Sequence, residues 1–329
     1  MKNEICVVTG ATGFVGSHLV DLLLEKGYQV RIVARKSSNL QWIDRSRVSV
    51  YDCGLDDTGR LAEAFLGANY IYHVAGVVKS KTKEGYHYGN VITTGNVLEA
   101  ALRTKDTLRK LVVVSSQTAA GPSPAPEPID EQFFPNPITT YGISKREQEK
   151  LCEGYYDRLP ITVCRACAVY GERDTEIFIF FRTYASGLMT KVGFDEKRLN
   201  LIHIADLVNG LYLASLSEKS RGEIYFLASE ETYSWDEVRR VCEKVFQKKS
   251  LSISIPHFLV YTISAFAEFF SMFSTAAPTL NIEKARDLTR KYWTCSVKKA
   301  VNDFGFRQTI SLEEGISKTV NWYREKNWL

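Results

Sequence analysis

The sequence predicts an α/β protein: an open, parallel β-sheet with helices on both faces, followed by a smaller, mostly helical C-terminal lobe. Three observations predict it. Short apolar runs alternate with amphipathic stretches through the first half of the chain, a glycine-rich turn follows the first run, and the alternation weakens after Gly171. Alternating strands and helices are typical of a doubly wound sheet, because each crossover helix returns the chain to the same edge.

The elements follow one another in a regular order. We predict strands in ICVVTG, YQVRIVAR, VSVYD, YIYHVAG, KLVVVSSQ and ITVCRACAVYG. We predict helices in FVGSHLVDLLLEKG, GRLAEAFLGA, NVITTGNVLEAALRT and YGISKREQEKLCEGYYDRL. The stretch LNLIHIADLVNGLYLASLSE then adds one more strand and helix, and most of the chain from about residue 230 is helical.

Composition excludes several classes of protein. A chain of 329 residues with 45% hydrophobic residues can bury a large core, so disorder is excluded as its main state. Its 42 basic and 38 acidic residues are spread without a long basic run, and we expect no nucleic-acid partner. The seven cysteines are scattered and no signal peptide precedes the first strand, which indicates a cytoplasmic protein.

Cys164 and Cys167 form a CxxC pair that invites a metal or redox interpretation. The pair lies in a predicted strand, where residues three apart face opposite sides. No second cysteine pair or histidine-rich segment supplies further ligands. We therefore expect two packed thiols and no metal site.

The turn after the first strand carries Gly10, Gly13 and Gly16 and leads directly into a helix. Glycines in this strand–turn–helix context permit a tight turn and let the backbone and the helix N-terminus approach a pyrophosphate. The sequence therefore predicts a Rossmann-type dinucleotide site.

The end of the second strand bears on the choice of cofactor. An enzyme that binds NAD(H), whose adenosine ribose carries a free 2′-hydroxyl group, normally has an acidic residue there. This chain has Ala34 instead, followed by Arg35. Lys36, Ser37 and Ser38 come next. A guanidinium beside hydroxyl groups suits a 2′-phosphate, so we expect NADP(H) to be favoured over NAD(H).

The segment YGISK places Tyr141 four residues before Lys145, on one face of a predicted helix. The preceding strand ends in VVVSSQTAAG and brings Ser116 and Thr118 to the carboxyl edge of the sheet, where ligands of parallel sheets gather. An adjacent ammonium and a cationic nicotinamide favour phenolate, so we expect Tyr141 to titrate below its usual value near ~10.

With these motifs in order, the sequence resembles the extended short-chain dehydrogenase/reductase family, also called the NAD-dependent epimerase/dehydratase family. The resemblance covers nearly the whole chain, through TGATGFVG, HVAG, NVITTGN, SSQTAAG, YGISK, RACAVYG, LIHIADL and KKAVNDFGF. It implies that Ser116 hydrogen-bonds the substrate oxygen, that Tyr141 is the acid/base, and that Lys145 holds the ribose.

The resemblance also implies the other contacts. The cofactor would be bound by Gly10, Thr12, Gly13, Phe14, Val15, Gly16, Arg35, His73, Ala75, Tyr141 and Lys145, and the substrate by Thr118 and Ala168. It implies a homodimer in which the helices near Asn90 and Tyr141 pack against their mates. It also divides the chain into an NADP-binding Rossmann domain (1–170, joined by 200–228) and a substrate-binding lobe (171–199 and 229–329).

Three positions depart from the sugar-nucleotide epimerases of that family. Ala168 replaces an asparagine that contacts the sugar nucleotide, and Leu199 stands where an arginine addresses the diphosphate. The neighbouring Arg198 is expected to face the other way on a strand. Gly54 replaces an aspartate near the adenine. The first two losses weaken the case for a nucleotide-sugar substrate.

The sequence therefore favours an NADP(H)-dependent oxidoreductase that acts on a ketone or secondary alcohol with a largely apolar skeleton. It resembles the dihydroflavonol reductase and 3β-hydroxysteroid dehydrogenase branch. A nucleotide-sugar epimerase or dehydratase is the alternative, and a non-catalytic NAD(P)-binding sensor is a second one. The aromatic stretch EIFIFFRTYASGLM fits either a substrate cavity or ordinary core.

Two further segments carry predictions about the surroundings of the site. The proline-dense stretch GPSPAPEPIDEQFFPNP is expected to form a rim of the active site. Residues 256–277 are apolar, but Glu268 lies in the middle of the run, so a transmembrane span is not expected. We expect a helix that covers an apolar pocket, with an interfacial membrane contact as the alternative.

Overall fold

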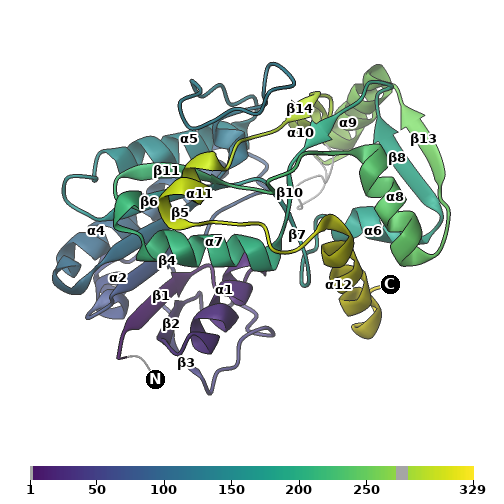
Figure 1. Ribbon diagram of the computed structural model, residues 1–329. Helices are drawn as coiled ribbons and strands as arrows, with labels where there is room; N and C mark the ends of the chain where they lie inside the picture. The colour runs from purple at the N-terminus through teal and green to yellow at the C-terminus, as the bar shows by residue number, and fades with distance from the viewer. Residues whose placement is uncertain (1–2, 272–280) are drawn as a thin grey trace.

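The computed structural model describes residues 3–271 and 281–329 and contains the predicted doubly wound sheet (Figure 1). Seven parallel strands lie in the order β11-β6-β5-β4-β1-β2-β3. In chain order they are β1 (Ile5–Thr9), β2 (Gln29–Val33), β3 (Val48–Tyr51), β4 (Tyr70–His73), β5 (Lys110–Ser116), β6 (Ile161–Ala166) and β11 (Glu223–Leu227). The strand order reverses beside β1, and ligands of such sheets bind at this switch point.

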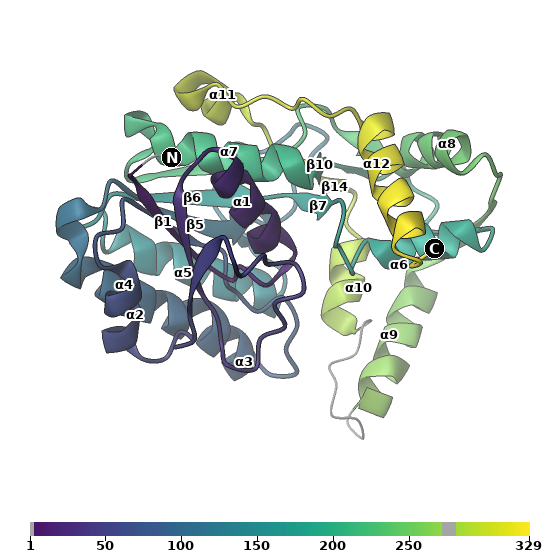
Figure 2. The same cartoon turned by 90° about the horizontal axis from the view of Figure 1, so that it is seen from below.

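Two layers of helices cover the sheet (Figure 2). One face carries α2 (Thr58–Phe65), α4 (Thr93–Arg103) and α5 (Thr140–Glu153), and the other carries α1 (Phe14–Glu25), α7 (Ile204–Leu216) and α11 (Lys298–Phe304). Side chains alternate along β1: Cys6 and Val8 belong to the core under α1, and Val7 belongs to the core under α2. The two cores explain why these strands read as continuous apolar runs.

A third apolar cluster holds together the region at the other end of the molecule. Helices α6 (Phe178–Ala185), α8 (Trp235–Phe246) and α12 (Leu312–Glu325) contribute to this cluster, and α9 (His257–Ser271) and α10 (Ile282–Leu288) lie in the same region without contributing to it. Short strands accompany them: β7 (Ala168–Tyr170), β8 (Leu188–Val192), β9 (Arg198–Leu199), β10 (Leu201–His203), β12 (Tyr233–Ser234), β13 (Leu251–Ile255) and β14 (Tyr292–Trp293). Ser234 begins α8 with a capping box to Glu237.

The proline-dense loop, expected to form an active-site rim, is attached to two parts of the molecule. Ser123 and Ile129 pair with Tyr292 and Cys295, next to and within β14, so the loop is attached to the C-terminal part of the chain. The large cavity described below has no lining residue from residues 121–137. The end of the loop, at Asn136 and Pro137, lies against the turn after β5 and the start of the helix that carries Tyr141. The rim therefore stays a prediction.

Helix α9 differs from its predicted role as the cover of an apolar pocket. Phe258, Phe266 and Phe270 are between 62% and 72% exposed, and no residue of α9 lines the large cavity. No helix in the described part of the chain is long and apolar enough to cross a membrane. The rest of the predicted segment, residues 272–277, lies outside the described residues, and membrane contact stays an alternative.

Candidate active site

The glycine turn brings β1, the loop after β4 and the start of α1 into close contact. Gly10 has φ +70°, and a Cβ there would lie 2.6 Å from the backbone nitrogen of Ala75. A Cβ on Gly16 would lie 2.1 Å from the carbonyl oxygen of Gly10. Only glycine fits either position. Thr12, Phe14 and Val15 are half-buried along the same turn.

The N-terminus of α1 fits the phosphates of a dinucleotide. Gly13 begins the helix without a side-chain cap, and the first turn contains no acidic residue. The uncapped N–H groups and the positive end of the helix dipole therefore favour an anion at this point.

Arg35 follows β2 at the same edge and is exposed. Its backbone bridges to Cys53, and its Cγ would lie 3.6 Å from a Cβ at Gly54. Gly54, which stands where many relatives have an aspartate, thus lies directly beside Arg35. The guanidinium forms no ion pair with a described residue, which leaves it available to a ligand.

Tyr141 lies in the first turn of α5, which Thr139 caps by accepting a hydrogen bond from the Gly142 amide. Burial raises the pKa of Tyr141 to about 12, and the Ser116 hydroxyl, which hydrogen-bonds the phenol, opposes that rise. Thr118 donates to the Ser116 oxygen from its own hydroxyl at 2.9 Å. Ser116, Thr118 and Tyr141 therefore come together as predicted, but burial outweighs the expected lowering of the phenol pKa.

Lys145 lies one turn further along α5 and is almost fully buried. Its Nζ donates to the carbonyl oxygen of Val114 at 2.8 Å. Burial lowers the pKa of Lys145 to about 8, while the Glu149 carboxylate acts in the opposite direction. An ammonium that titrates near neutral pH is thus held beneath the switch point by the backbone of β5.

Asn90 is a buried residue of this region for which the sequence predicts no role in the site. Its amide nitrogen donates to the Val77 oxygen and the Ser144 hydroxyl, and its Oδ1 accepts from the Val77 amide. It lies in a π-helical turn, Tyr88–Ile92, which joins α3 (Lys83–His87) to α4. The motif NVITTGN predicts the helix, but it does not predict the π-helical turn that directs the Asn90 side chain toward Ser144 of α5.

His73 is fully buried at the end of β4. The Thr94 hydroxyl donates its hydrogen to the Asn90 carbonyl oxygen. In its 2.8 Å hydrogen bond with His73 Nε2 the hydroxyl oxygen is therefore the acceptor, and the ring N–H is the donor. Nδ1 then accepts from the Thr9 hydroxyl at 2.8 Å. Burial lowers the pKa of His73 to about 3. The neutral ring joins β1, β4 and α4, and both of its nitrogens have protein partners, so contact with a cofactor stays a prediction.

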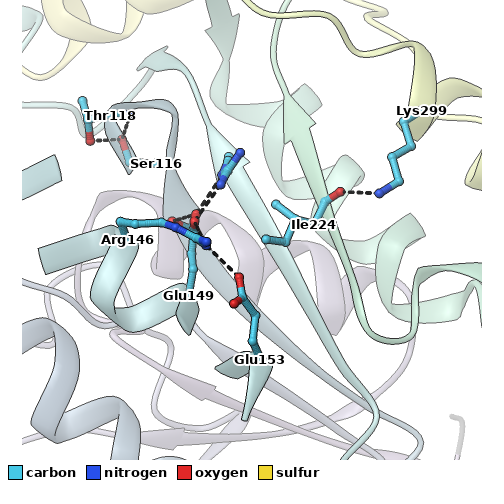
Figure 3. A network of polar contacts seen from close by, with 9 residues as sticks. Ser116, Thr118, Arg146, Glu149, Glu153, Ile224 and Lys299 are labelled. Atoms are coloured by element: carbon cyan, nitrogen blue, oxygen red, sulfur yellow. Dashed lines mark hydrogen bonds and ion pairs between the residues drawn. The ribbon is translucent and has the colours of Figure 1, made fainter. Parts of the chain in front are cut away.

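A buried ion pair supports the helix that carries Tyr141 and Lys145 (Figure 3). Glu149 accepts two hydrogen bonds of 2.8 Å from Arg165, one on each carboxylate oxygen, and a third from Ser115. Both members of the pair are at most 1% exposed. A bidentate pair of this kind fixes α5 against β6 in one register.

A cavity of about 730 Å³ lies between the carboxyl edge of the sheet and the C-terminal region. Ser116, Thr118 and Ala168, the three residues expected at the substrate, all line it. Its walls are largely apolar and include Ile177, Phe180, Phe181, Trp235, Leu288, Trp293, Leu312 and Ile316. The side chains therefore form a largely apolar cavity that includes Ser116 in its lining, which is the first of the two interpretations that the sequence left open for the aromatic stretch.

The expectation that Arg198 faces away from this cavity was wrong. Arg198 and Leu199 both line it. The alternation rule is weak here because β9 has only two residues. The Arg198 guanidinium itself contacts the Thr232 hydroxyl at 3.5 Å. Arg198 also pairs with Glu196 at 3.1 Å, so its charge is partly compensated.

Two polar residues of the cavity were missed from the sequence. They are Asp287 of α10 and Gln117 of the turn after β5. One atom of each, Asp287 Oδ1 and Gln117 Nε2, is buried and has no hydrogen-bond partner among the described residues. No local pattern marks Asp287, because its place at the site depends on how α10 packs on α5.

Both members of the CxxC pair are buried in the same apolar cluster. Burial raises the pKa of Cys167 to about 12 and that of Cys164 further. Neither thiol is ionised near neutral pH, which agrees with a packing role.

A parallel sheet with a glycine turn at its switch point, and a serine, tyrosine and lysine beside it, defines a short-chain dehydrogenase/reductase type of enzyme. The chain belongs to the NAD-dependent epimerase/dehydratase family, whose sequence profile matches residues 6–228. It is therefore an NAD(P)-dependent oxidoreductase or epimerase of this type.

Several curated proteins are similar over nearly their whole length. A ceramide reductase of Caulobacter vibrioides is 27% identical, covering 99% of this chain and 96% of its own. A UDP-N-acetyl-α-D-glucosaminuronate decarboxylase of Bacillus cytotoxicus is 25% identical and covers 97% and 98%. The mouse sterol-4-α-carboxylate 3-dehydrogenase (decarboxylating) is 25% identical and covers 97% and 91%.

Solved structures support the fold. The UDP-glucose 4-epimerase of Thermotoga maritima with UDP-glucose superimposes with a TM-score of 0.81 at 22% identity, covering 98% of this chain and 99% of that one. At this identity the likeness establishes the architecture.

Proposed function

We propose that this enzyme is an NADP(H)-dependent oxidoreductase that interconverts a ketone and a secondary alcohol on a largely apolar substrate. One observation carries the proposal: the cavity that ends at Ser116, with Tyr141 hydrogen-bonded behind it, has mainly apolar walls. A substrate with an apolar skeleton and one reacting oxygen fits that arrangement.

Three residues of the chain, Ser116, Tyr141 and Lys145, have separate roles in the proposed reaction. When bound, the nicotinamide cofactor supplies or accepts the hydride. Ser116 donates a hydrogen bond to the substrate oxygen, and Tyr141 gives a proton to that oxygen or removes one from it. Lys145 holds the ribose and adds positive charge beneath the site, which favours the phenolate of Tyr141.

The preference for NADP(H) rests on the neighbourhood of β2. Arg35 is exposed and has no acidic partner in the described residues, and Gly54 leaves space beside it. A guanidinium in this position attracts a 2′-phosphate, and no carboxylate repels one.

The names of two relatives agree with an oxidoreductase, since one is a ceramide reductase and another a sterol dehydrogenase. Arg198 at the cavity edge is the one observation that favours a nucleotide-sugar substrate, and a decarboxylase of that class is also a relative. The apolar walls and Ala168 outweigh it. A sensor without turnover is set aside, because the family consists of enzymes.

We also infer the arrangement of the domains and the assembly. Residues 1–170 with 200–228 form the cofactor domain, and residues 171–199 and 229–329 form the substrate lobe. A homodimer is supported by the surface between α3 and α5, where Tyr88, Ile92 and Ile143 are each between 44% and 51% exposed. A cytoplasmic location is supported by the seven cysteines, all described, among which no disulfide forms.

Cofactor titration tests the preference for NADP(H). Quenching of protein fluorescence by NADPH and NADH is measured in the wild type and in Arg35→Ala. We expect tighter binding of NADPH, and at least a tenfold loss of that preference in the variant, because a charge-assisted pair to phosphate contributes about 1.5–3 kcal/mol. A preference for NADH that ignores Arg35 would contradict the assignment.

Turnover tests the catalytic role of Tyr141. Oxidation of NADPH is followed with a panel of apolar ketones, in the wild type and in Tyr141→Phe. Loss of the proton donor is expected to lower kcat about 10²- to 10⁴-fold while NADPH still binds. Unchanged kcat would remove Tyr141 from the mechanism.

A further inference from the structure

Helix α9 presents an apolar face to solvent. Five of its large apolar side chains are between 39% and 72% exposed: Phe258, Leu259, Ile263, Phe266 and Phe270. At 3.6 residues per turn these five positions share one face of the helix. No charged residue lies on that face, and the hydroxyl of Thr262, which also lies there, donates to the carbonyl oxygen of Phe258. The exposed surface of α9 is therefore apolar along its length.

The opposite face of α9 is held by the protein. Val260 is 5% exposed, and the hydroxyl of Tyr261 lies 3.1 Å from that of Thr289, just after α10. The carboxylate of Glu268 accepts a hydrogen bond from the amide of Ile282, at the start of α10. The two helices extend side by side away from the sheet (Figure 2). Contact with α10 thus fixes α9 with its apolar side outward, the reverse of an ordinary surface helix.

The charges beside α9 indicate which surface fits its apolar face. Four basic residues of α10 and the segment after it are exposed: Lys284, Arg286, Arg290 and Lys291. The two acidic residues of α10 are only half-exposed, and one of them, Glu283, accepts a hydrogen bond from the amide of Thr140. Asp195, near the start of α9, pairs with Lys197, and Glu268 is the one acidic residue of α9 itself. An apolar helix face flanked by exposed cations is typical of helices that bind anionic phospholipid.

The large cavity reaches the surface next to the same helix pair. Lys284 and Arg290 line the cavity and are also exposed, and Leu288 lines it from the same helix. Helix α10 therefore contacts the cavity with one side and α9 with another. Molecules with an apolar skeleton collect in a bilayer rather than in water. A bilayer at α9 would bring such molecules close to the opening of the cavity.

We propose that the apolar face of α9 docks on the surface of a phospholipid bilayer that contains anionic lipid. The phenylalanine side chains enter the boundary between headgroups and acyl chains, and the cations of α10 meet the headgroups. At 15 residues α9 is shorter than the roughly 20 residues of a transmembrane helix, so it lies in the plane of the interface. The docking does not depend on the proposed reaction.

A second copy of the chain is a poorer occupant of this face. A two-fold contact through α9 would bring the same cations of both copies together, and like charges repel. The surface that supports a homodimer, between α3 and α5, includes no residue of α9. The two surfaces are therefore separate.

Flotation of the full-length protein with vesicles tests the docking. Vesicles of phosphatidylcholine alone are compared with vesicles in which about a third of the lipid is phosphatidylglycerol. The wild type is expected to float with the anionic vesicles and to partition at least about tenfold less onto phosphatidylcholine alone, because each cation near an anionic surface contributes about fivefold. Added salt is expected to reduce this difference.

Variants of α9 identify the face that docks. Phe266→Ala and Phe270→Ala are each expected to lower the partition coefficient about three- to tenfold, because each removes apolar area that leaves water on docking. Phe134→Ala is the matched control, since Phe134 is 87% exposed on the proline-dense loop, and it is expected to change nothing. Urea denaturation is expected to be the same in all three variants, because each side chain is already exposed.

Two further variants separate the apolar and the charged contributions. Arg286→Gln combined with Lys291→Gln is expected to weaken binding to the anionic vesicles and to leave binding to phosphatidylcholine unchanged. In Phe266→Trp, brominated acyl chains are expected to quench the added fluorescence, which shows that this position enters the bilayer. Phe134→Trp is the control, and its added fluorescence is expected to stay unquenched.

The outcomes are distinct. A wild type that does not float with anionic vesicles, or an equal loss in Phe134→Ala and Phe266→Ala, would overturn the proposal. So would a Phe266→Ala variant that keeps its vesicle binding and loses self-association in light scattering, which would assign the face to a second copy. Vesicle binding without turnover of any ketone would refute the oxidoreductase function and leave the docking standing, whereas turnover without vesicle binding would do the reverse.

Discussion

The two walls of the active site differ in how their polar groups are satisfied. On the wall built by β4, β5 and α5, the side chains of His73, Asn90, Lys145 and Glu149 hydrogen-bond to protein partners. On the wall built by α6, β9 and α10, the lining is mostly apolar and Asp287 keeps an unpaired oxygen. The first wall is joined by buried polar contacts, although Gln117 Nε2 and Gln148 Oε1 stay unpaired among the described residues. The second wall is held mainly by apolar packing, and this difference is expected if one wall positions a cofactor and the other recognises a substrate.

The largest effect is expected at the glycine turn of the first wall. In Gly16→Ala the new Cβ would lie 2.1 Å from the Gly10 oxygen, so the turn must open. We expect a loss of about 3 kcal/mol or more in the free energy of unfolding and loss of NADPH binding. Chemical denaturation and fluorescence titration measure the two effects.

Gly13→Ala is the control for that substitution. A Cβ on Gly13 would lie 3.4 Å from the same oxygen, an ordinary contact. The free energy of unfolding is expected to change by less than about 1 kcal/mol. Equal destabilisation by the two alanines would show that the close approach at Gly16 does not govern the turn.

The first wall was largely predictable from the sequence, because its motifs are local. Gly10, Ser116 and Tyr141 each follow a strand or start a helix, and the parallel sheet brings such positions to one edge. The second wall was not. The contact between Thr140 and Glu283 joins residues 143 positions apart, and no periodicity encodes it. The errors at Arg198 and α9 have the same cause, since both depend on packing in the C-terminal region.

The second largest effect is expected at the buried ion pair. Glu149→Gln leaves Arg165 buried without its counter-charge. We expect a loss of about 3–5 kcal/mol at pH 7, measured by urea denaturation. Glu153→Gln, one turn further on and half-exposed, is the control and is expected to have a small effect.

The pH dependence of Glu149→Gln separates its two causes. The pKa of Lys145 is about 8 in the folded protein, below its ordinary value of 10.5, and Glu149 keeps it from falling further. Below that pKa Lys145 is charged and the variant loses its attraction to Glu149. As the pH rises through 8 the lysine becomes neutral and this part of the loss disappears, whereas the part due to Arg165 remains. Denaturation at pH 6.5 and pH 9 should therefore give a smaller difference at the higher pH, and a constant difference would contradict the coupling.

The smallest effect on stability is expected on the second wall. The indole Nε1 of Trp293 donates to the Asp287 carbonyl at 3.0 Å, and that carbonyl also accepts from the Arg290 amide. Because the acceptor keeps a partner, Trp293→Phe is expected to lower the free energy of unfolding by only about 1 kcal/mol. Trp235→Phe, at another wall position, is the control for the loss of ring volume.

The informative readout for Trp293→Phe is the binding of apolar ketones. The bond to the Asp287 carbonyl fixes the end of α10, so its loss should weaken ketone binding more than Trp235→Phe does, although the free energy of unfolding changes by only about 1 kcal/mol. The first wall would then lose stability when a partner is removed, and the second would lose ligand affinity. If Trp293→Phe cost as much stability as Glu149→Gln, the two walls would be equally integral to the fold, and the contrast between them would fail.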